Sequence, residues 1–179
     1  SLRADKVFGK NKTSKIPNIE SLIKNGVYFE QAICSTPATG VSVSSIFTGL
    51  YPFKIGMGSE KYQKFNPKIR NCIQILKEND YNTYATSPEI TNDLGVTHDF
   101  ENPDKSYNNY FSLFAGLGNQ IIQKISANYL KKPWFFYIHI LDLHKPVVVP
   151  KKFDDEKFGL SQYERMLSAT DFWIGKILE

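Results

Sequence analysis

The chain has 179 residues, a formal net charge of +4, 13 Phe and 10 Tyr. This length suffices for one domain with a hydrophobic core, and the composition is that of a globular protein, not a disordered one. The 22 basic side chains are scattered, as at Lys10, Lys12 and Lys15, and form no compact stripe with interleaved aromatic residues. This pattern argues against nucleic-acid binding, and we expect most lysines to lie on a solvated surface.

The ends of the chain and its two cysteines give information on whether the sequence is a whole protein and on where the protein is located. The first residue is not Met and the last residues, "IGKILE", resemble part of a helix, so we expect a piece of a longer protein, truncated at both ends. No apolar run reaches the length of a membrane span. A membrane anchor elsewhere, and a cytoplasmic or cell-envelope location, therefore stay open. Cys34 and Cys72 are too few for a disulfide framework, and we expect two small packing residues rather than one bridge.

The first predicted helix covers residues 17–25. Pro17 suits the first turn of a helix, and Gly26 suits the position after its last turn. The apolar side chains of this segment recur at helical spacing: Ile19, Leu22 and Ile23. The pattern indicates a helix with one buried face.

A second predicted helix covers residues 39–48, although β-branched residues and Ser make it a poor helix in isolation. Val43, Ile46 and Phe47 have helical spacing, and Gly49 can end the helix. Thr39 then lies at or just before the first turn. Free backbone N–H groups and the helix dipole there suit sulfate or phosphate oxygens and lower the pKa of a hydroxyl nucleophile. The local sequence alone favours a plain N-cap role for Thr39.

The remaining elements alternate between helix and strand. Ile69, Ile73 and Leu76 mark a helix, and the segment 81–87 after it is a short strand. Further predicted elements are a loop and helix within 106–130, an apolar strand at 133–141 that suits a sheet centre covered on both faces, and an amphipathic helix at 160–179. The predicted fold class is α/β, with a mixed sheet flanked by helices on both faces.

Three polar residues follow or interrupt the strand at 133–141. His139 lies within the apolar run, so a hydrogen-bonded core histidine is favoured over a metal ligand. Asp142 and His144 follow the end of the strand, where sites in α/β folds gather. For Asp142, a turn-forming role and a functional role are equally supported.

Five stretches occur in a fixed order: "SLRAD", "PNIESLIKNGVYFEQA", "TGLYP", "ILKENDYNTYATS" and "FFYIHILDLHKP". This series resembles the sulfatase family of the alkaline phosphatase superfamily over essentially the whole chain. The resemblance implies that residues 1–179 are the N-terminal part of a single, incomplete sulfatase-like catalytic domain. It also implies that His144, which matches the family's His before x-Pro, lies near the substrate and donates a proton to the leaving group or binds an oxyanion.

The family's signature is Cys-x-Pro-Ser-Arg before a Thr-Gly-x-x-Pro ending, and counting back from Thr48 puts the nucleophile at Thr39. Ser42 matches the signature serine and is a predicted substrate-binding residue, as is Asp142. Cys34 lies five residues too early. Threonine cannot form the formylglycine of standard sulfatases. It resembles instead the nucleophile of relatives that transfer phosphoethanolamine or phosphoglycerol from lipid donors.

Two further parts of the sequence depart from the family pattern. Val41 and Val43 stand where the family has proline and arginine, and Ser87-Pro88-Glu89 replaces the stretch with a sulfate-binding lysine. The site therefore lacks two fixed positive charges. Three explanations stay open. Other residues supply the positive charge, the substrate differs from that of standard sulfatases, or the protein is not an active enzyme.

The resemblance also implies a divalent metal, Ca, Mg, Mn or Zn, in the intact protein. The family's first metal-binding aspartate precedes "SLRAD", and its Asp-His-Gly stretch does not occur here. Ser1 stands where many sulfatases have a second aspartate, and Arg3 and Asp5 are favoured as a local ion pair. The chain thus supplies chiefly the Thr39 hydroxyl as a metal ligand, and alone it should bind metal weakly and catalyse nothing.

The predicted function is a sulfatase-like, metal-dependent hydrolase of sulfate or phosphate esters with Thr39 as nucleophile and His144 as second catalytic residue. The substrate is a small-molecule, glycan or lipid ester. The alternatives are a phosphoethanolamine- or phosphoglycerol-type phosphotransferase, a non-catalytic sulfatase-like binding protein, and an unrelated small α/β domain. The oligomeric state is left open.

Overall fold

The computed structural model describes residues 2–57 and 64–179. Ser1, for which the sequence suggested a place near a metal, lies outside the described residues. The chain forms two compact units. Unit 1 comprises residues 1–30, 111–126 and 140–179, and unit 2 comprises residues 31–110 and 127–139.

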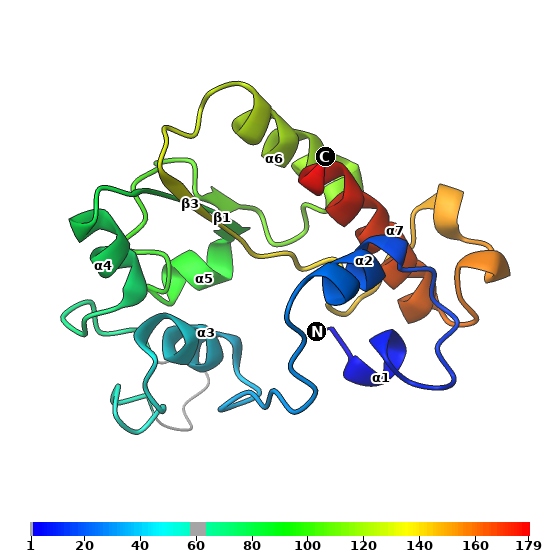
Figure 1. The fold of residues 1–179 in the computed structure, drawn as a ribbon, viewed down its shortest axis with the longest axis horizontal. Helices are drawn as coiled ribbons and strands as arrows, with labels where there is room; N and C mark the ends of the chain where they lie inside the picture. Colours follow the sequence, from blue (N-terminus) through cyan, green and yellow to red (C-terminus); the bar gives the residue numbers. More distant parts are fainter. Residues whose placement is uncertain (1, 58–63) are drawn as a thin grey trace. The chain divides into compact units, whose positions relative to one another are not determined.

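Unit 2 contains a parallel sheet in the order β2-β1-β3 (Figure 1). Strand β1 pairs with β3 from Asn82 opposite Trp134 to Thr86 opposite Ile138, and its end pairs with β2. The elements of unit 2 are α3 (Thr39–Thr48), α4 (Cys72–Glu78), β1 (Asn82–Pro88), α5 (Glu89–Asp93), β2 (Ser106–Tyr107) and β3 (Trp134–Ile138).

The α/β class is confirmed, with two differences in the sheet. All three strands of the described residues run parallel, whereas a mixed sheet was predicted. In this sheet β1 is the central strand and β3 lies at an edge, so the prediction that the 133–141 strand is central was wrong. An apolar run marks contact with a core, but it does not reveal on how many sides a strand is paired. Trp134 is 38% exposed, which fits an edge position.

Side chains complete the edge of β1 that β2 leaves unpaired. The N–H of Ala85 donates to Oδ1 of Asn102 at 2.8 Å, and Nδ2 of Asn102 donates back to the carbonyl of Ala85 at 2.9 Å. The N–H of Thr83 donates to Oε2 of Glu101 at 2.7 Å. The backbone groups of β1 are thereby satisfied without a full-length neighbour on this side.

The core of unit 2 joins the sheet to its helices. The rings of Phe47 in α3 and Tyr137 in β3 meet edge to face, with centroids 5.1 Å apart, and Phe100 stacks near Tyr137 at 5.8 Å. The buried members of this cluster are Val43, Phe47, Ile73, Ala85, Leu94, Val96 and Phe100. Aromatic packing therefore fixes α3 against one face of the sheet.

Helix α4 begins later than predicted, at Cys72. Asn71 is its N-cap, and its side-chain oxygen accepts from the N–H groups of Ile73 and Gln74. Asn is among the best N-cap residues, so it sets the helix start. Ile69 lies before the helix and packs in a separate apolar cluster with Phe65.

Unit 1 is built around the long helix α7. Its capping box joins Ser161 and Glu164, and α2 and α6 pack against it (Figure 1). The elements of unit 1 are α1 (Ala4–Val7), α2 (Pro17–Asn25), η1 (Leu113–Ala115), α6 (Leu117–Ser126), η2 (Lys151–Phe153), η3 (Glu156–Phe158) and α7 (Gln162–Leu178). The helices at 17–25 and 160–179 are confirmed, although Leu22, predicted to face the core, is 50% exposed.

One carboxylate and one glycine allow α7 to pack closely against α2 and α6. Buried Asp171 accepts from the N–H groups of Asn18 and Ile19 at 3.1 and 2.8 Å, and so caps the start of α2 from another helix. A Cβ atom on Gly118 of α6 would lie 2.4 Å from the ring of Trp173. Only glycine permits this close approach of α6 to α7.

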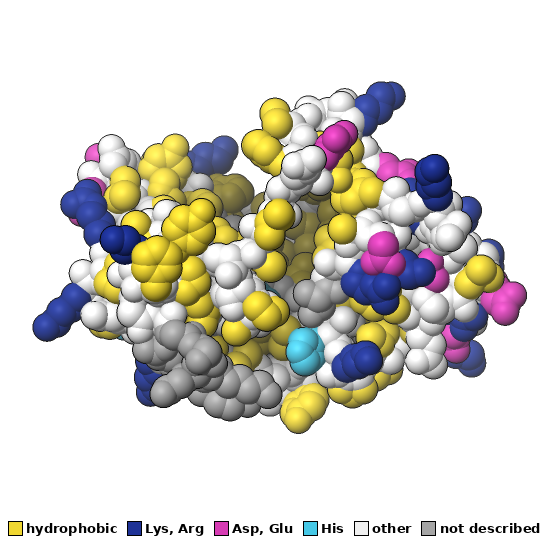
Figure 2. Space-filling view, turned by 90° about the horizontal axis from the view of Figure 1, so that it is seen from below, with side chains coloured by type: hydrophobic (Ala, Val, Ile, Leu, Met, Phe, Trp, Pro, Cys, Tyr) yellow, Lys and Arg dark blue, Asp and Glu magenta, His cyan; other side chains and the backbone are white. Residues whose placement is uncertain are grey.

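Hydrophobic side chains reach the surface at many points of the face shown in Figure 2, among basic and acidic groups. Within the described part of the chain, no helix combines the length and the apolar character needed to cross a membrane.

Candidate functional site

Helix α3 presents the predicted nucleophile at its first position. Ala38, in extended conformation with φ −86° and ψ 127°, is the N-cap, and no side chain of the described residues caps the helix. The N-cap role for Thr39, favoured by local sequence, was therefore wrong by one residue. The Thr39 side chain is exposed, next to first-turn N–H groups and the positive end of the helix dipole. This is an arrangement that suits an oxyanion.

The predicted end of α3 is confirmed at Gly49, whose φ of 68° is left-handed and whose N–H donates to the carbonyl of Ser45. Glycine adopts this conformation without steric cost.

Two buried valines anchor α3 close to Thr39. Val41 packs with Ile55 and Met57, and Val43 packs in the core cluster of the sheet. These valines stand where the family pattern has proline and arginine, so packing has replaced a charged side chain at position 43. Ser42, between them, is partly buried, and its N–H donates to Ala38.

Both cysteines carry free thiols. Cys34 is exposed, which contradicts its predicted role as a packing residue, because it lies before α3 in an irregular segment rather than on a core-facing element. Cys72 is partly buried against the core cluster of unit 2, and burial raises the pKa of its thiol. The predicted packing role is thus confirmed for Cys72 alone.

The segment that replaces the family's lysine lies at the carboxyl end of β1. Ser87 is fully buried, and its N–H donates to the carbonyl of Lys105 at 2.9 Å. Glu89 begins α5 directly after it. No fixed positive charge stands in this stretch of three residues.

His139 follows β3 in unit 2 and is hydrogen-bonded, as predicted. Its Nδ1 lies 2.7 Å from the hydroxyl of Tyr137, and its N–H donates to the carbonyl of Thr86 at 2.9 Å. Burial lowers the pKa of His139 and raises that of Tyr137 to about 12. The sequence analysis did not foresee this pair, although residues two apart on a strand point to one face.

Asp142 and His144 lie in unit 1, in the turn region after β3. Oδ1 of buried Asp142 accepts from the N–H of Leu113 at 3.1 Å, which ties this turn to the start of η1. Burial raises the pKa of Asp142 to about 6, and the bond from Leu113 partly opposes the rise. His144 is exposed, and its Nδ1 lies 3.0 Å from the carbonyl of Lys145.

The predicted site residues thus fall into two pairs. Thr39 and Ser42 share helix α3 in unit 2, and Asp142 and His144 share a turn region in unit 1. The predicted ion pair of Arg3 with Asp5, in unit 1, is confirmed at 2.8 Å.

The described residues do not by themselves fit a metal site. Within residues 2–57 and 64–179, no three His, Cys, Asp or Glu side chains gather closely enough to hold one ion. Structural and catalytic metal sites need several such ligands. The role of Thr39 as a metal ligand is therefore still a prediction.

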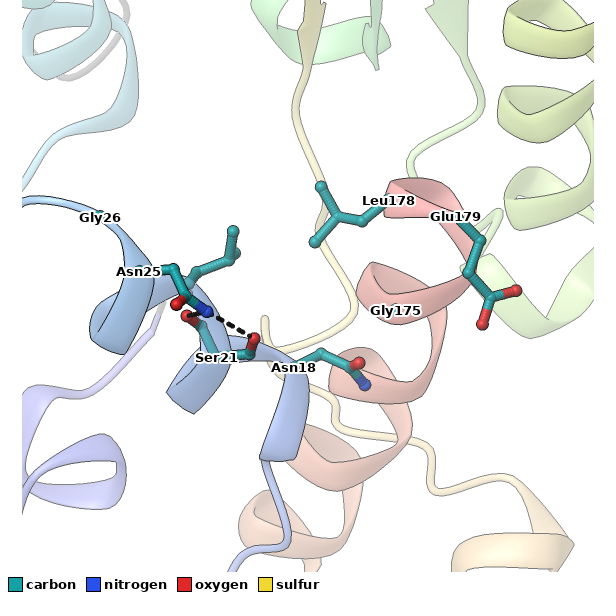
Figure 3. A pocket seen from close by; sticks show the side chains of 8 residues that line it. Asn18, Ser21, Asn25, Gly26, Gly175, Leu178 and Glu179 are labelled. Carbon is teal, nitrogen blue, oxygen red and sulfur yellow. Dashed lines mark hydrogen bonds between the residues drawn. The ribbon is translucent and has the colours of Figure 1, made fainter.

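A pocket of about 350 Å³ lies between α2 and the end of α7 in unit 1 (Figure 3). It contains none of the predicted site residues. Its walls consist of amides, a hydroxyl, glycines, leucines and one carboxylate, and Asn25 in it is hydrogen-bonded to Ser21. Such a lining offers neither a nucleophile with a neighbouring base nor an oxyanion site.

Comparison with known proteins identifies the chain at the level of family. A search of curated proteins gave no significant match. A family model described as Sulfatase matches residues 1–179, the entire chain. The ordered motifs, the α/β fold and this match agree, and the chain belongs to the sulfatase family.

Proposed function

We propose that the protein acts on sulfate or phosphate esters with Thr39 as the nucleophile. The observation that carries the proposal is the exposed position of Thr39 at the start of α3, nine residues before Thr48 of the family's Thr-Gly ending. Neighbouring N–H groups in the first turn of α3 stabilise negative charge on the Thr39 oxygen and on the ester oxygens.

In the proposed reaction, Thr39 loses its hydroxyl proton to solvent, and its oxygen attacks sulfur or phosphorus in line with the leaving group. A bond from Thr39 to sulfur or phosphorus forms, and the bond to the leaving alcohol breaks. We assign the proton donation to that alcohol to His144, and its match to the family's His before x-Pro supports the assignment. The sulfuryl or phosphoryl group then passes from Thr39 to water in a hydrolase or to an acceptor alcohol in a transferase; its bond to the Thr39 oxygen breaks, and the proton of the water or alcohol goes to solvent as the Thr39 hydroxyl is regenerated.

Sulfatases generally use a divalent metal, which neutralises oxyanion charge when bound. The described residues of this chain do not assemble a ligand set for it, so the steps above are assigned to side chains of the chain alone.

Transfer to an alcohol is the second candidate. Threonine at position 39 and buried Val43 in place of the signature arginine both depart from standard sulfatases. Phosphodiester donors with an added acceptor alcohol would show transfer as a new ester product. Binding of esters without any turnover would instead support a non-catalytic role.

The test is a pair of substitutions in the full-length protein, assayed on an aryl sulfate and an aryl phosphodiester. Thr39→Ala should lower kcat by at least about 10³-fold because the nucleophile is gone, whereas Thr39→Ser should retain part of the activity. Thr48→Ala removes a threonine hydroxyl from the other end of the same helix and serves as the matched control. Full activity of Thr39→Ala would refute the proposal.

A further inference from the structure

Tyr137 and His139 form a pair at the carboxyl end of β3. The Tyr137 hydroxyl lies 2.7 Å from Nδ1 of His139, and the two ring centroids lie 6.0 Å apart. The backbone also holds His139, because its N–H donates to Thr86 and its carbonyl accepts from the Tyr107 hydroxyl at 2.7 Å. Contacts to β1 and β2 therefore hold the backbone of His139, and the Tyr137 hydroxyl on β3 is the group that contacts its ring.

The place of this pair in the sheet is one where α/β proteins bind ligands. Strand β1 is followed in sequence by β2 on one side of it and then by β3 on the other. Such a reversal of strand order opens a crevice at the carboxyl ends of the two strands involved, here β1 and β3. His139 extends from that end of β3, opposite Ser87 and Pro88 at the end of β1.

The pair also lies on the face of the sheet that carries α3. Tyr137 packs against Phe47 of α3, and its hydroxyl reaches the His139 ring, so both side chains share that face. Thr39 precedes Val43 and Phe47 at spacings of four residues, which places the three on one side of the helix. Thr39 and His139 therefore belong to the same side of one sheet, within the same unit.

The contact with Tyr137 favours one tautomer of His139, the one that carries its proton on Nε2. Burial raises the pKa of Tyr137 to about 12, so its hydroxyl is protonated, and burial lowers the pKa of His139, so its ring is neutral at neutral pH. Within the described residues, Nδ1 of His139 is the acceptor within reach of the Tyr137 hydroxyl. When Tyr137 donates to Nδ1, the hydrogen of the neutral ring resides on Nε2.

From this geometry we propose that Nε2–H of His139 donates a hydrogen bond to a non-bridging oxygen of the ester that Thr39 attacks. The proposal rests on the proposed function of Thr39 and names a further substrate-binding residue for it. A neutral donor here takes over oxyanion binding where Val43 stands in place of the family's arginine and Ser87-Pro88-Glu89 in place of the stretch with its lysine.

The experiment compares steady-state kinetics of the full-length protein and its variants on an aryl sulfate and an aryl phosphodiester. His139→Ala should raise KM for the two esters, and the inhibition constant of inorganic sulfate, by about tenfold, because one hydrogen bond to a charged group is lost. His139→Gln keeps an N–H donor and should recover part of that loss. His98→Ala is the matched control, since His98 is exposed in the same unit and pairs with Asp99.

A binding measurement keeps the proposal testable if His139→Ala fails to fold. In the wild-type protein, ¹⁵N NMR should show His139 protonated on Nε2 and unprotonated on Nδ1, with the Nε2 resonance shifting on titration with inorganic sulfate. The inference would be overturned if the Nε2 resonance did not shift at saturating sulfate. It would also be overturned if a folded His139→Ala variant had unchanged KM values and an unchanged inhibition constant for sulfate. Either result would leave the proposed function intact as long as the Thr39→Ala variant is inactive. An active Thr39→Ala variant would refute the proposed function, independently of the results for His139.

Discussion

Glu164 is a buried acidic residue of unit 1 whose charge should contribute to stability. Its carboxylate is buried, with a side chain 3% exposed. Oε2 accepts from the Ser161 hydroxyl at 2.7 Å, and Oε1 accepts from the N–H of Thr13 at 3.2 Å and from Nζ of Lys6 at 3.3 Å. Burial alone would raise the pKa of Glu164, but these hydrogen bonds outweigh it and lower the pKa to about 2.

The magnitude and its sign follow from this pKa. A fall from an ordinary value of 4.5 to about 2 corresponds to a contribution of about 3 kcal/mol to folding. Because the folded-state pKa lies below the unfolded one, this contribution is present above pH 4.5 and is lost as the pH falls through about 2. Glu164→Gln should therefore destabilise the protein by about 3 kcal/mol at pH 7 and by much less near pH 2.

Urea denaturation of the full-length protein between pH 2 and pH 7 measures this difference, with hydrogen exchange of α7 amides reporting on unit 1 alone. Glu156→Gln, at an exposed position in η3, is the control and should change stability by no more than about 0.5 kcal/mol. The reasoning would be refuted if Glu164→Gln cost as little as Glu156→Gln at pH 7, or if its cost did not diminish at low pH.

Two further substitutions test the packing and another buried carboxylate of unit 1. Asp142 has a pKa raised to about 6 by burial, so its ionisation removes up to about 3 kcal/mol of stability as the pH rises from 3.8 to about 6. Asp142→Asn, which keeps an oxygen acceptor for Leu113, should abolish that loss in denaturation curves recorded at pH 4 and pH 7; an unaltered pH dependence would contradict it. Gly118→Ala should lower the melting temperature by an amount equivalent to about 1–3 kcal/mol, because the added Cβ would lie 2.4 Å from the Trp173 ring. An unchanged melting temperature would show that α6 can move away from α7 without cost.

The sequence predicted helices and strands well where periodicity and end signals coincide. Helix α3 is an example, because the spacing of Val43 and Phe47 and the glycine at position 49 are all local properties. The sequence did not determine whether α3 begins at Thr39 or at the residue after it. In the first case Thr39 belongs to the helix, and in the second it caps the helix. That choice depends on the backbone conformation of Ala38, which no side-chain pattern records.

Features that depend on distant parts of the chain were not predictable. The edge position of β3 depends on which strands lie next to it, and the exposure of Cys34 depends on what packs near the segment before α3. The Tyr137–His139 bond was within reach of sequence reasoning, because alternation on a strand puts the two side chains on one face. The placement of the pair at a reversal of strand order required the topology of the sheet.

The side chain of Asn102 has a consequence for how this sheet can associate. By donating to the carbonyl of Ala85 and accepting from its N–H, Asn102 occupies both hydrogen-bonding groups that an invading strand would need at the middle of β1. An open strand edge is a template for aggregation, and natural proteins protect such edges in several ways. Here the buried amide of Asn102, together with Glu101 at Thr83, blocks intermolecular strand pairing along this edge. Loss of the Asn102 amide would leave the N–H and the carbonyl of Ala85 open to a strand of another molecule.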